Sequence, residues 1–135
     1  MQYWIDGYNL LFRLSKSKRS LEEKRRHLIS EINKQAKELR LEVTIVFDAS
    51  DPTQIHDRRS HFDSLELIYT RGHITADEAI LEALEHNNKP SLICVVSSDK
   101  ELTAKARALS AQTLSLNGFF YVFYKGNEKT HLETV

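Results

Sequence analysis

Four aspartates in this chain carry side chains suited to metal-assisted chemistry at phosphate. Asp6, Asp48 and Asp99 each stand at or just after the end of an apolar run, and Asp77 begins a helical pattern. Carboxylates gathered in one cleft raise one another's pKa, and a hard divalent cation relieves their repulsion. Oxygen ligands favour Mg²⁺ or Mn²⁺ over Zn²⁺. Because such a cation activates water and stabilises charge on a scissile phosphate, the pattern predicts phosphodiester hydrolysis without a Ser, Cys or His nucleophile.

Each of these acids also has a simpler structural interpretation. Asp6 and Asp48 could hydrogen-bond the backbone of a following turn. Asp77 and Asp99 could stabilise the dipole of a helix from its first turn. We favour the chemical interpretation for Asp6, Asp77 and Asp99, and both interpretations stay open for Asp48.

Two neighbouring side chains are further candidates. Glu78 is the third residue after Thr75, so a capping box explains it better than metal binding does. Asn9 could hydrogen-bond a carboxylate or a phosphate, or cap the turn after Asp6, and both roles stay open. Ser98 is expected to cap the next helix, which leaves Asp99 free to face the strand edge.

Alternating strands and helices must position these side chains. Strands are expected over residues 2–6, 43–47, 65–69, 92–96 and 119–124, and helices over about 21–39, 76–86 and 99–109. This order predicts a single α/β domain over residues 1–135 with a mainly parallel sheet. In such sheets sites form beyond the carboxyl ends of the strands, so distant acids can meet there.

Composition argues against several other classes of protein. Lysine plus arginine and aspartate plus glutamate both total 19, which argues against general basicity but not against a local basic patch. The seven Lys/Arg residues between Arg13 and Arg26 fit either a solvated helix face or phosphate contacts. No apolar run reaches the roughly 18 residues of a membrane span. We expect no signal peptide, no membrane partner, a buried inert Cys94 thiol and a cytoplasmic protein.

Other catalytic signatures are missing from the sequence. It contains no phosphate-binding glycine loop, dinucleotide fingerprint or H-E-x-x-H motif. Its histidines are dispersed, and surface or loop roles fit them better than metal binding does.

Four stretches resemble motifs of a known family. They are Ile5-Asp6-Gly7-Tyr8-Asn9-Leu10-Leu11, Val46-Phe47-Asp48-Ala49, Tyr69-Thr70-Arg71-Gly72-His73-Ile74-Thr75-Ala76-Asp77-Glu78 and Val95-Val96-Ser97-Ser98-Asp99. In this order they are similar to the YacP-like group of NYN domains, a branch of the PIN-like nucleases. The resemblance runs from Met1 to about Leu109.

The resemblance implies a three-layer α/β/α domain with a five-stranded sheet of order 3-2-1-4-5. It also implies a divalent-metal endoribonuclease acting on single-stranded RNA, since members of the group include ribosome-associated enzymes that cleave messenger RNA. The site residues carried over are the catalytic metal ligands Asp6, Asp77 and Asp99, the auxiliary acids Asp48 or Glu78, and Asn9 as the residue that orients Asp6.

Substrate contacts are expected from residues around the same edge. Arg71 and Lys100 are the preferred phosphate contacts, with simple solvation as the alternative for both. His73 lies beside Arg71. Tyr8 could stack on an unpaired base, whereas core packing is the better interpretation of Tyr69.

Two alternatives to an RNA-cleaving enzyme remain. Many PIN-like proteins carry another acid shortly after the fourth-strand aspartate, but position 103 here is Thr. This difference is the reason to consider a catalytically inactive RNA- or ribosome-binding module. A metal-dependent DNA nuclease is the other alternative, because the phosphate chemistry is the same.

Overall fold

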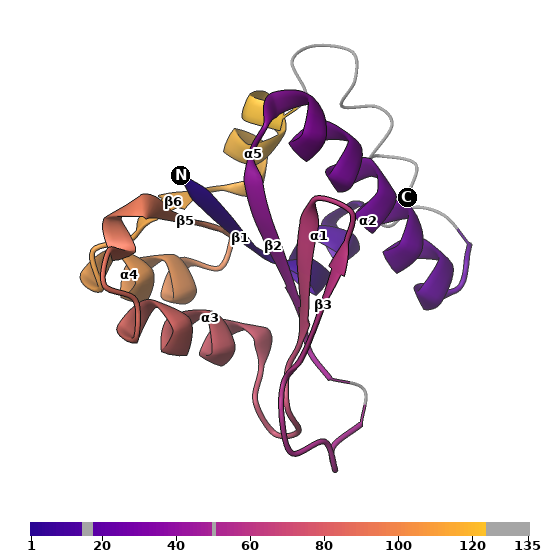
Figure 1. Cartoon of the computed structure of the whole chain (residues 1–135), viewed down its shortest axis with the longest axis horizontal. Helices are drawn as coiled ribbons and strands as arrows, with labels where there is room; N and C mark the ends of the chain where they lie inside the picture. Colours follow the sequence, from indigo (N-terminus) through magenta and orange to yellow (C-terminus); the bar gives the residue numbers. More distant parts are fainter. Residues whose placement is uncertain (15–17, 50, 124–135) are drawn as a thin grey trace.

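A twisted, mainly parallel sheet forms the centre of the computed structural model, which describes residues 1–14, 18–49 and 51–123 (Figure 1). The six strands are β1 (Gln2–Asp6), β2 (Glu42–Phe47), β3 (Arg58–Phe62), β4 (Leu65–Tyr69), β5 (Ile93–Val96) and β6 (Gln112–Leu114). The helices are α1 (Gly7–Leu14), α2 (Leu21–Leu39), α3 (Ala76–Glu85), α4 (Lys100–Ala108) and α5 (Leu116–Phe123), with a short 3₁₀ helix, η1 (Pro90–Leu92).

The strand order is β3-β4-β2-β1-β5-β6. Within the described residues, only β3 runs antiparallel to its neighbour, β4, and the other four pairings are parallel. The expected order of the first four strands is therefore confirmed, as β4-β2-β1-β5. Asp6 pairs with Val46 and Phe47 pairs with Tyr69, so the carboxyl ends of these strands reach the same edge of the sheet.

The strand expected over residues 119–124 is wrong for the residues that the structure describes. Phe119 to Phe123 belong to α5, which buries Phe119, Phe120 and Phe123 and exposes Tyr121. Gln112–Leu114 takes the position beside β5 instead. A further strand, β3, occupies a stretch for which no strand is predicted, and all five of its residues are exposed.

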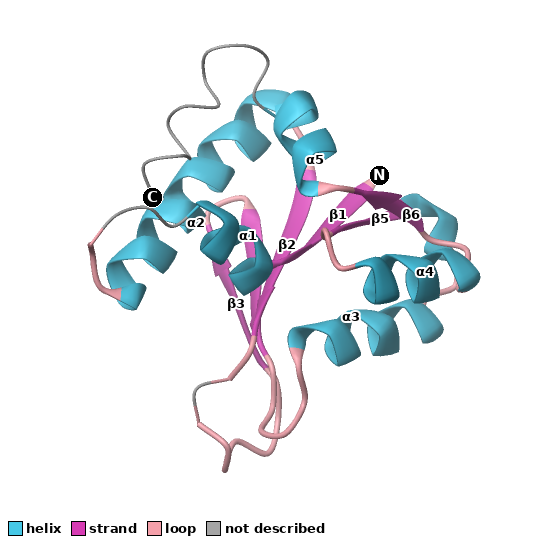
Figure 2. Ribbon diagram, turned by 180° about the vertical axis from the view of Figure 1, so that it is seen from behind, coloured by secondary structure: helices cyan, strands magenta, loops and turns pink. Residues whose placement is uncertain are grey.

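Different helices cover the two faces of the sheet (Figure 2). Helices α1, α2 and α5 pack on a core that includes Ile5, Ile45 and Phe47. Helices α3 and α4 pack on a second core that includes Trp4 and Val46. Successive residues of β1 thus serve opposite cores, as the pleat of a strand requires, and both faces of the central strands are buried.

Two expectations about individual segments are confirmed. The helix expected over residues 21–39 is α2, and Ser20 caps it by accepting a hydrogen bond from the backbone N–H of Glu23. Cys94 is buried in β5, and burial raises the pKa of its thiol to about 11. Among the described residues, no helix has both the length and the apolar character needed to cross a membrane.

Candidate active site

Asp6 stands where β1 passes directly into α1, rather than in a glycine turn. Its Oδ1 accepts a hydrogen bond of 3.3 Å from the backbone N–H of Asn9, which satisfies one free donor of the first helical turn. The helix can begin this close to the sheet because residue 7 is glycine. A Cβ at Gly7 would lie 2.4 Å from the ring of Phe47.

Asp77 reaches the same edge from the first turn of α3. Thr75 caps this helix by accepting from the backbone N–H of Glu78, as the capping box predicts. Asp48, which follows β2, accepts a hydrogen bond from the backbone N–H of Ala76. Asp48 thus ties the start of α3 to the end of β2, so the structure gives it an anchoring contact as well as a place beside the other acids.

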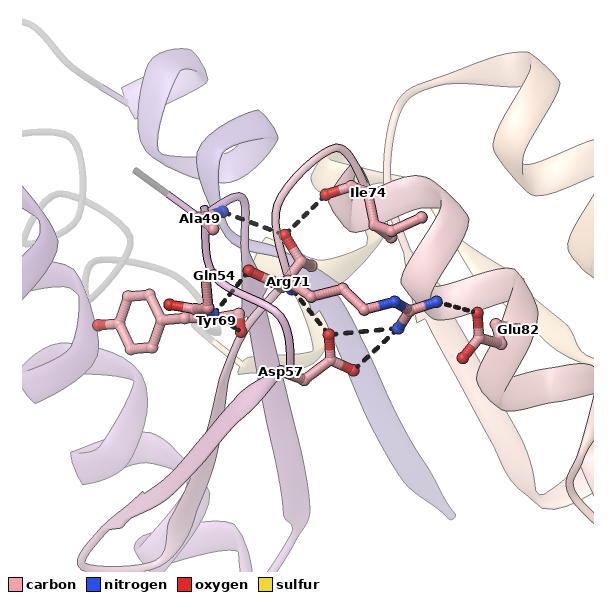
Figure 3. A network of polar contacts seen from close by, with 8 residues as sticks. Ala49, Gln54, Asp57, Tyr69, Arg71, Ile74 and Glu82 are labelled. Carbon is pink, nitrogen blue, oxygen red and sulfur yellow. Dashed lines mark hydrogen bonds and ion pairs between the residues drawn. The ribbon is translucent and has the colours of Figure 1, made fainter. Parts of the chain in front are cut away.

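The loop between β4 and α3 is held by a network of polar contacts (Figure 3). Arg71 donates to Glu82 over 2.7 Å and to Asp57 over 3.3 Å. Its backbone N–H also donates to Asp57, over 2.8 Å. The hydroxyl of Thr70 donates to the carbonyl of Ile74 over 2.7 Å. These contacts fix the path of the chain into α3 and therefore the position of Asp77.

Asp99 is itself the cap of α4, which corrects the expectation that Ser98 is the cap. Its Oδ1 accepts from the backbone N–H groups of Glu101 and Leu102, at 2.9 and 3.1 Å. Ser98 instead donates its backbone N–H to Oδ1 of Asn9 over 3.2 Å. The backbone of Asn9 thus binds Asp6 while its side chain binds the segment before Asp99, so this residue joins the ends of β1 and β5.

The three aspartates of the prediction meet at this edge. The pKa of Asp6 is raised to about 7, first by burial and then by a hydrogen-bonding contact with Asp77 and by the charges of Asp77 and Asp48. The pKa of Asp77 is also raised, chiefly by burial, with the charge of Asp99 and a contact with its carboxyl group adding to the shift. Asp77 therefore lies between Asp6 and Asp99, within hydrogen-bonding reach of both.

The chemistry of this donor set fits a hard divalent cation, because its members are all carboxylates and a cation relieves the repulsion between like charges. Among the described residues, however, no three or more Asp, Glu, His or Cys side chains are grouped so as to hold a metal ion as they stand. The proposed cation site therefore rests on the chemistry of the acids and on their contacts with one another.

A small cavity of about 190 Å³ borders Asp77 and Asp99 between α3 and α4. Glu78 lines it, and the hydroxyl of Thr75 donates to its carboxylate over 3.2 Å, which matches the capping role. Lys105 also lines the cavity, where its ammonium group pairs with Glu101 over 2.9 Å. The hydrogen bond from Lys105 to Glu101 raises the pKa of Lys105, and the charges of Glu101, Asp99 and Asp77 add to this shift.

Lys105 is a functional candidate that the sequence analysis missed. The spacing of Glu101 and Lys105 marks an i,i+4 ion pair on α4, and both residues line the same cavity as Asp99. Lys100, the residue preferred for phosphate contact, is exposed at the start of α4. Its side chain makes no hydrogen bond or ion pair within the part of the chain that the structure describes.

The remaining predicted contact residues have different surroundings. The guanidinium of Arg71 is engaged by Asp57 and Glu82, so the structure gives it a positioning role, and the expected phosphate contact stays a prediction. His73 is exposed, with a φ of 67°, in the loop before α3. The ring of Tyr8 stacks on Phe12 with centroids 5.6 Å apart.

Comparisons with known proteins agree with this architecture. The family model of the YacP-like NYN domain matches residues 3–134. The crystal structure of Rae1 (YacP) from Bacillus subtilis is similar with a TM-score of 0.71 and 23% identity, over 98% of this chain and 75% of that chain. A tryptophan-to-leucine mutant of Rae1 gives a TM-score of 0.70 and 24% identity, over 98% and 76% of the two chains. These likenesses show the fold. No curated protein matches the chain.

Proposed function

The chain belongs to the YacP-like NYN domain family, and from this premise we propose that it is a divalent-metal-dependent endoribonuclease acting on single-stranded RNA. Membership supports a nuclease-type function related to RNA. The observation that carries the finer proposal is the meeting of Asp6, Asp77 and Asp99 at the carboxyl edge of the sheet. Three elements far apart in the chain bring these acids together, and core packing alone would not favour that arrangement.

In this proposal Asp6, Asp77 and Asp99 hold Mg²⁺ or Mn²⁺, and Asp48 borders the same site. The bound cation would supply a water molecule of lowered pKa and neutralise charge on the phosphate being cleaved. Asn9 acts as a positioning residue, because it contacts both Asp6 and Ser98. Lys105 adds a positive charge at the rim of the cavity that Asp77 and Asp99 border.

A direct test is the cleavage of a labelled single-stranded RNA in Mg²⁺ or Mn²⁺, with EDTA as the metal-free reference. We expect Asp77→Asn and Asp99→Asn to lower the cleavage rate by about a hundredfold or more. Asparagine is itself a good helix cap, so Asp99→Asn keeps α4 in place. If both variants cut as fast as the parent, the assigned site is wrong.

Asp63→Asn is the matched control. Asp63 lies in the turn between β3 and β4, at the opposite edge of the sheet, and its φ of 54° suits asparagine. This variant should cleave RNA like the parent. A single-stranded DNA of the same sequence, run in parallel, separates the RNA enzyme from a DNA nuclease, since only preference for RNA supports the proposal.

A catalytically inactive RNA- or ribosome-binding module is the second candidate. Thr103 favours it, because its hydroxyl donates to the carbonyl of Lys100 and provides no carboxylate to the site. Binding that persists in EDTA, together with no cleavage of free RNA or of messenger RNA in purified ribosome complexes, would establish this candidate. Cleavage only in the ribosome complexes would instead support an enzyme that acts on translated messenger RNA.

A further inference from the structure

A groove of about 540 Å³ opens beside Asp48, at the same edge of the sheet as the acids. Its lining includes Tyr8 of α1, Arg25 of α2, Arg58 of β3 and Tyr69 of β4. Because the charge of Asp48 acts on both Asp6 and Asp77, the groove that opens beside Asp48 adjoins the acidic site. The surface next to the acids is therefore lined by basic and aromatic side chains.

Aromatic rings hold the two arginines of this groove in place. The guanidinium of Arg58 lies 5.5 Å from the ring centroid of Tyr69, its cross-strand partner. The guanidinium of Arg25 lies 6.0 Å from the same ring and donates to the hydroxyl of Tyr8 over 3.1 Å. Phe47 stacks against Tyr69 with centroids 5.5 Å apart, so the ring is itself supported from the core. Guanidinium groups held in this way lose less conformational freedom when they bind a ligand.

The charge of Arg58 acts on exposed Asp51, where it adds to the hydrogen bonds from Thr53 that lower the pKa of that carboxyl group. No close ion pair, however, joins Arg25 or Arg58 to a carboxylate among residues 1–14, 18–49 and 51–123. Neighbouring arginines differ in this respect, since Arg26 pairs with Glu22 over 2.9 Å and Arg59 pairs with Glu66 over 3.5 Å. Planar guanidinium groups with free donors match the oxygens of a phosphate group.

We propose that this groove binds the phosphodiester backbone of single-stranded RNA beside the bond that is cleaved, with Arg25 and Arg58 each contacting a phosphate. This inference rests on the proposed function. In it, the RNA strand runs over α1, α2 and β3. The cavity between α3 and α4 is smaller and lined by carboxylates, so it suits a phosphate chain less well. The contacts are to phosphate, and the groove therefore holds RNA of any sequence.

The test measures binding without cleavage. The anisotropy of a fluorescent single-stranded RNA is followed in EDTA, at several salt concentrations, for the parent and for Arg25→Gln, Arg58→Gln and the double variant. We expect the double variant to bind at least about tenfold more weakly at low salt. We also expect the slope of log Kd against log salt to fall by about 1.4, since each phosphate contact on a single strand contributes about 0.7.

Two further variants separate charge from structure. Arg26→Gln is the matched control, because Arg26 is the next residue of α2 and is already paired with Glu22; it should leave the affinity and the slope unchanged. Changing Arg25 and Arg58 together to lysine should keep the slope of the parent while lowering affinity, because charge remains and the planar donors are lost. A merely structural role would not restore the slope in this way.

The outcomes distinguish this inference from the proposed function. If the glutamine variants bind RNA with the parent's affinity and slope, the groove is not the RNA path, even if the parent cleaves. If the parent binds through these arginines but cuts no RNA with any metal, the groove stands and the nuclease proposal fails. Equal loss of binding in Arg26→Gln would also overturn the inference, because the effect would then come from general charge.

Discussion

The carboxyl groups of Asp6 and Asp77 lie within hydrogen-bonding reach of each other, although one ends β1 and the other lies in the first turn of α3. When no cation is bound, a shared proton relieves the repulsion between them, and the two groups titrate as a pair. This relationship makes the stability of the metal-free protein depend on pH in an unusual direction for an aspartate.

Asp6→Asn is expected to stabilise the metal-free protein at alkaline pH. The pKa of Asp6 rises from 3.8 in the unfolded chain to about 7 in the folded protein, so the folded state binds this proton more tightly. Its contribution to stability is therefore complete below about pH 4 and is lost as the pH rises through about 7. Asparagine resembles the protonated acid, so the variant should gain on the order of 2–4 kcal/mol over the parent at about pH 8.

Urea unfolding in EDTA across this pH range measures the difference. Asp63→Asn provides a contrast of opposite sign, because hydrogen bonds from Asn33 and Lys37 lower the pKa of Asp63. Removing that carboxylate should cost stability at neutral pH, and the cost should vanish in acid. A gain for Asp6→Asn that did not change with pH would contradict the assignment of the shared proton.

Divalent cations are expected to stabilise the parent, and more strongly at about pH 8 than at about pH 5, because they compete with protons for the same carboxylates. At a hundred times its Kd, a cation bound only by the folded state adds about 2.7 kcal/mol. Thermal unfolding in MgCl₂ or MnCl₂, against KCl of equal ionic strength, measures this effect. Asp6→Asn should largely abolish it. An equal rise in Tm in the variant would show that the cation binds at another site.

Arg71→Gln is expected to lower both Tm and the rate of cleavage. The change removes ion pairs to Asp57 and Glu82 that hold the loop before α3, so Asp77 would shift. A displacement of this kind can slow a reaction by about ten- to a hundredfold. The salt slope of RNA binding should stay that of the parent, because Arg71 serves positioning. A lower slope with unchanged Tm would show that Arg71 binds phosphate after all.

Gly7→Ala is expected to destabilise the protein, although alanine is the better helix former. The new Cβ would lie 2.4 Å from an atom of the Phe47 ring, which is fully buried and unable to withdraw. Forcing a methyl group into a packed core costs about 1–3 kcal/mol. Denaturant unfolding measures this cost, and Gly118→Ala is a comparison in which the contact is the flexible side chain of Leu114. Equal stability of Gly7→Ala and the parent would contradict the close packing of α1 on β2.

The sequence predicts the central strands and the meeting of the acids because both depend on local patterns. Continuous apolar runs identify buried parallel strands, and aspartates at their ends must share an edge of the sheet. The run from Phe119 to Phe123 is predicted as a strand but forms a helix, because a short apolar stretch fits a strand and a buried helix equally well. Ser115 is the residue that indicates the start of a helix, because its hydroxyl accepts a hydrogen bond from the backbone N–H of Gly118 in the first turn of α5.

The side-chain partners that shape the site depend on tertiary contacts and could not be predicted in this way. Arg71 stands in a motif where a phosphate contact is a reasonable expectation, and only the fold brings Asp57 and Glu82 to it. Arg25 likewise meets Tyr69 through the packing of α2 on the sheet. The cap of α4 is Asp99 and not the expected Ser98, because both residue types suit the position before a helix.

The position of Cys94 has a practical consequence for spectroscopy. It is the chain's only cysteine, it is buried in β5, and its thiol stays protonated near neutral pH because its pKa is raised to about 11. Maleimide dyes attack thiolates, so the native protein should remain unlabelled. A second cysteine placed on the exposed strand β3 would then take up a single fluorophore without the removal of Cys94.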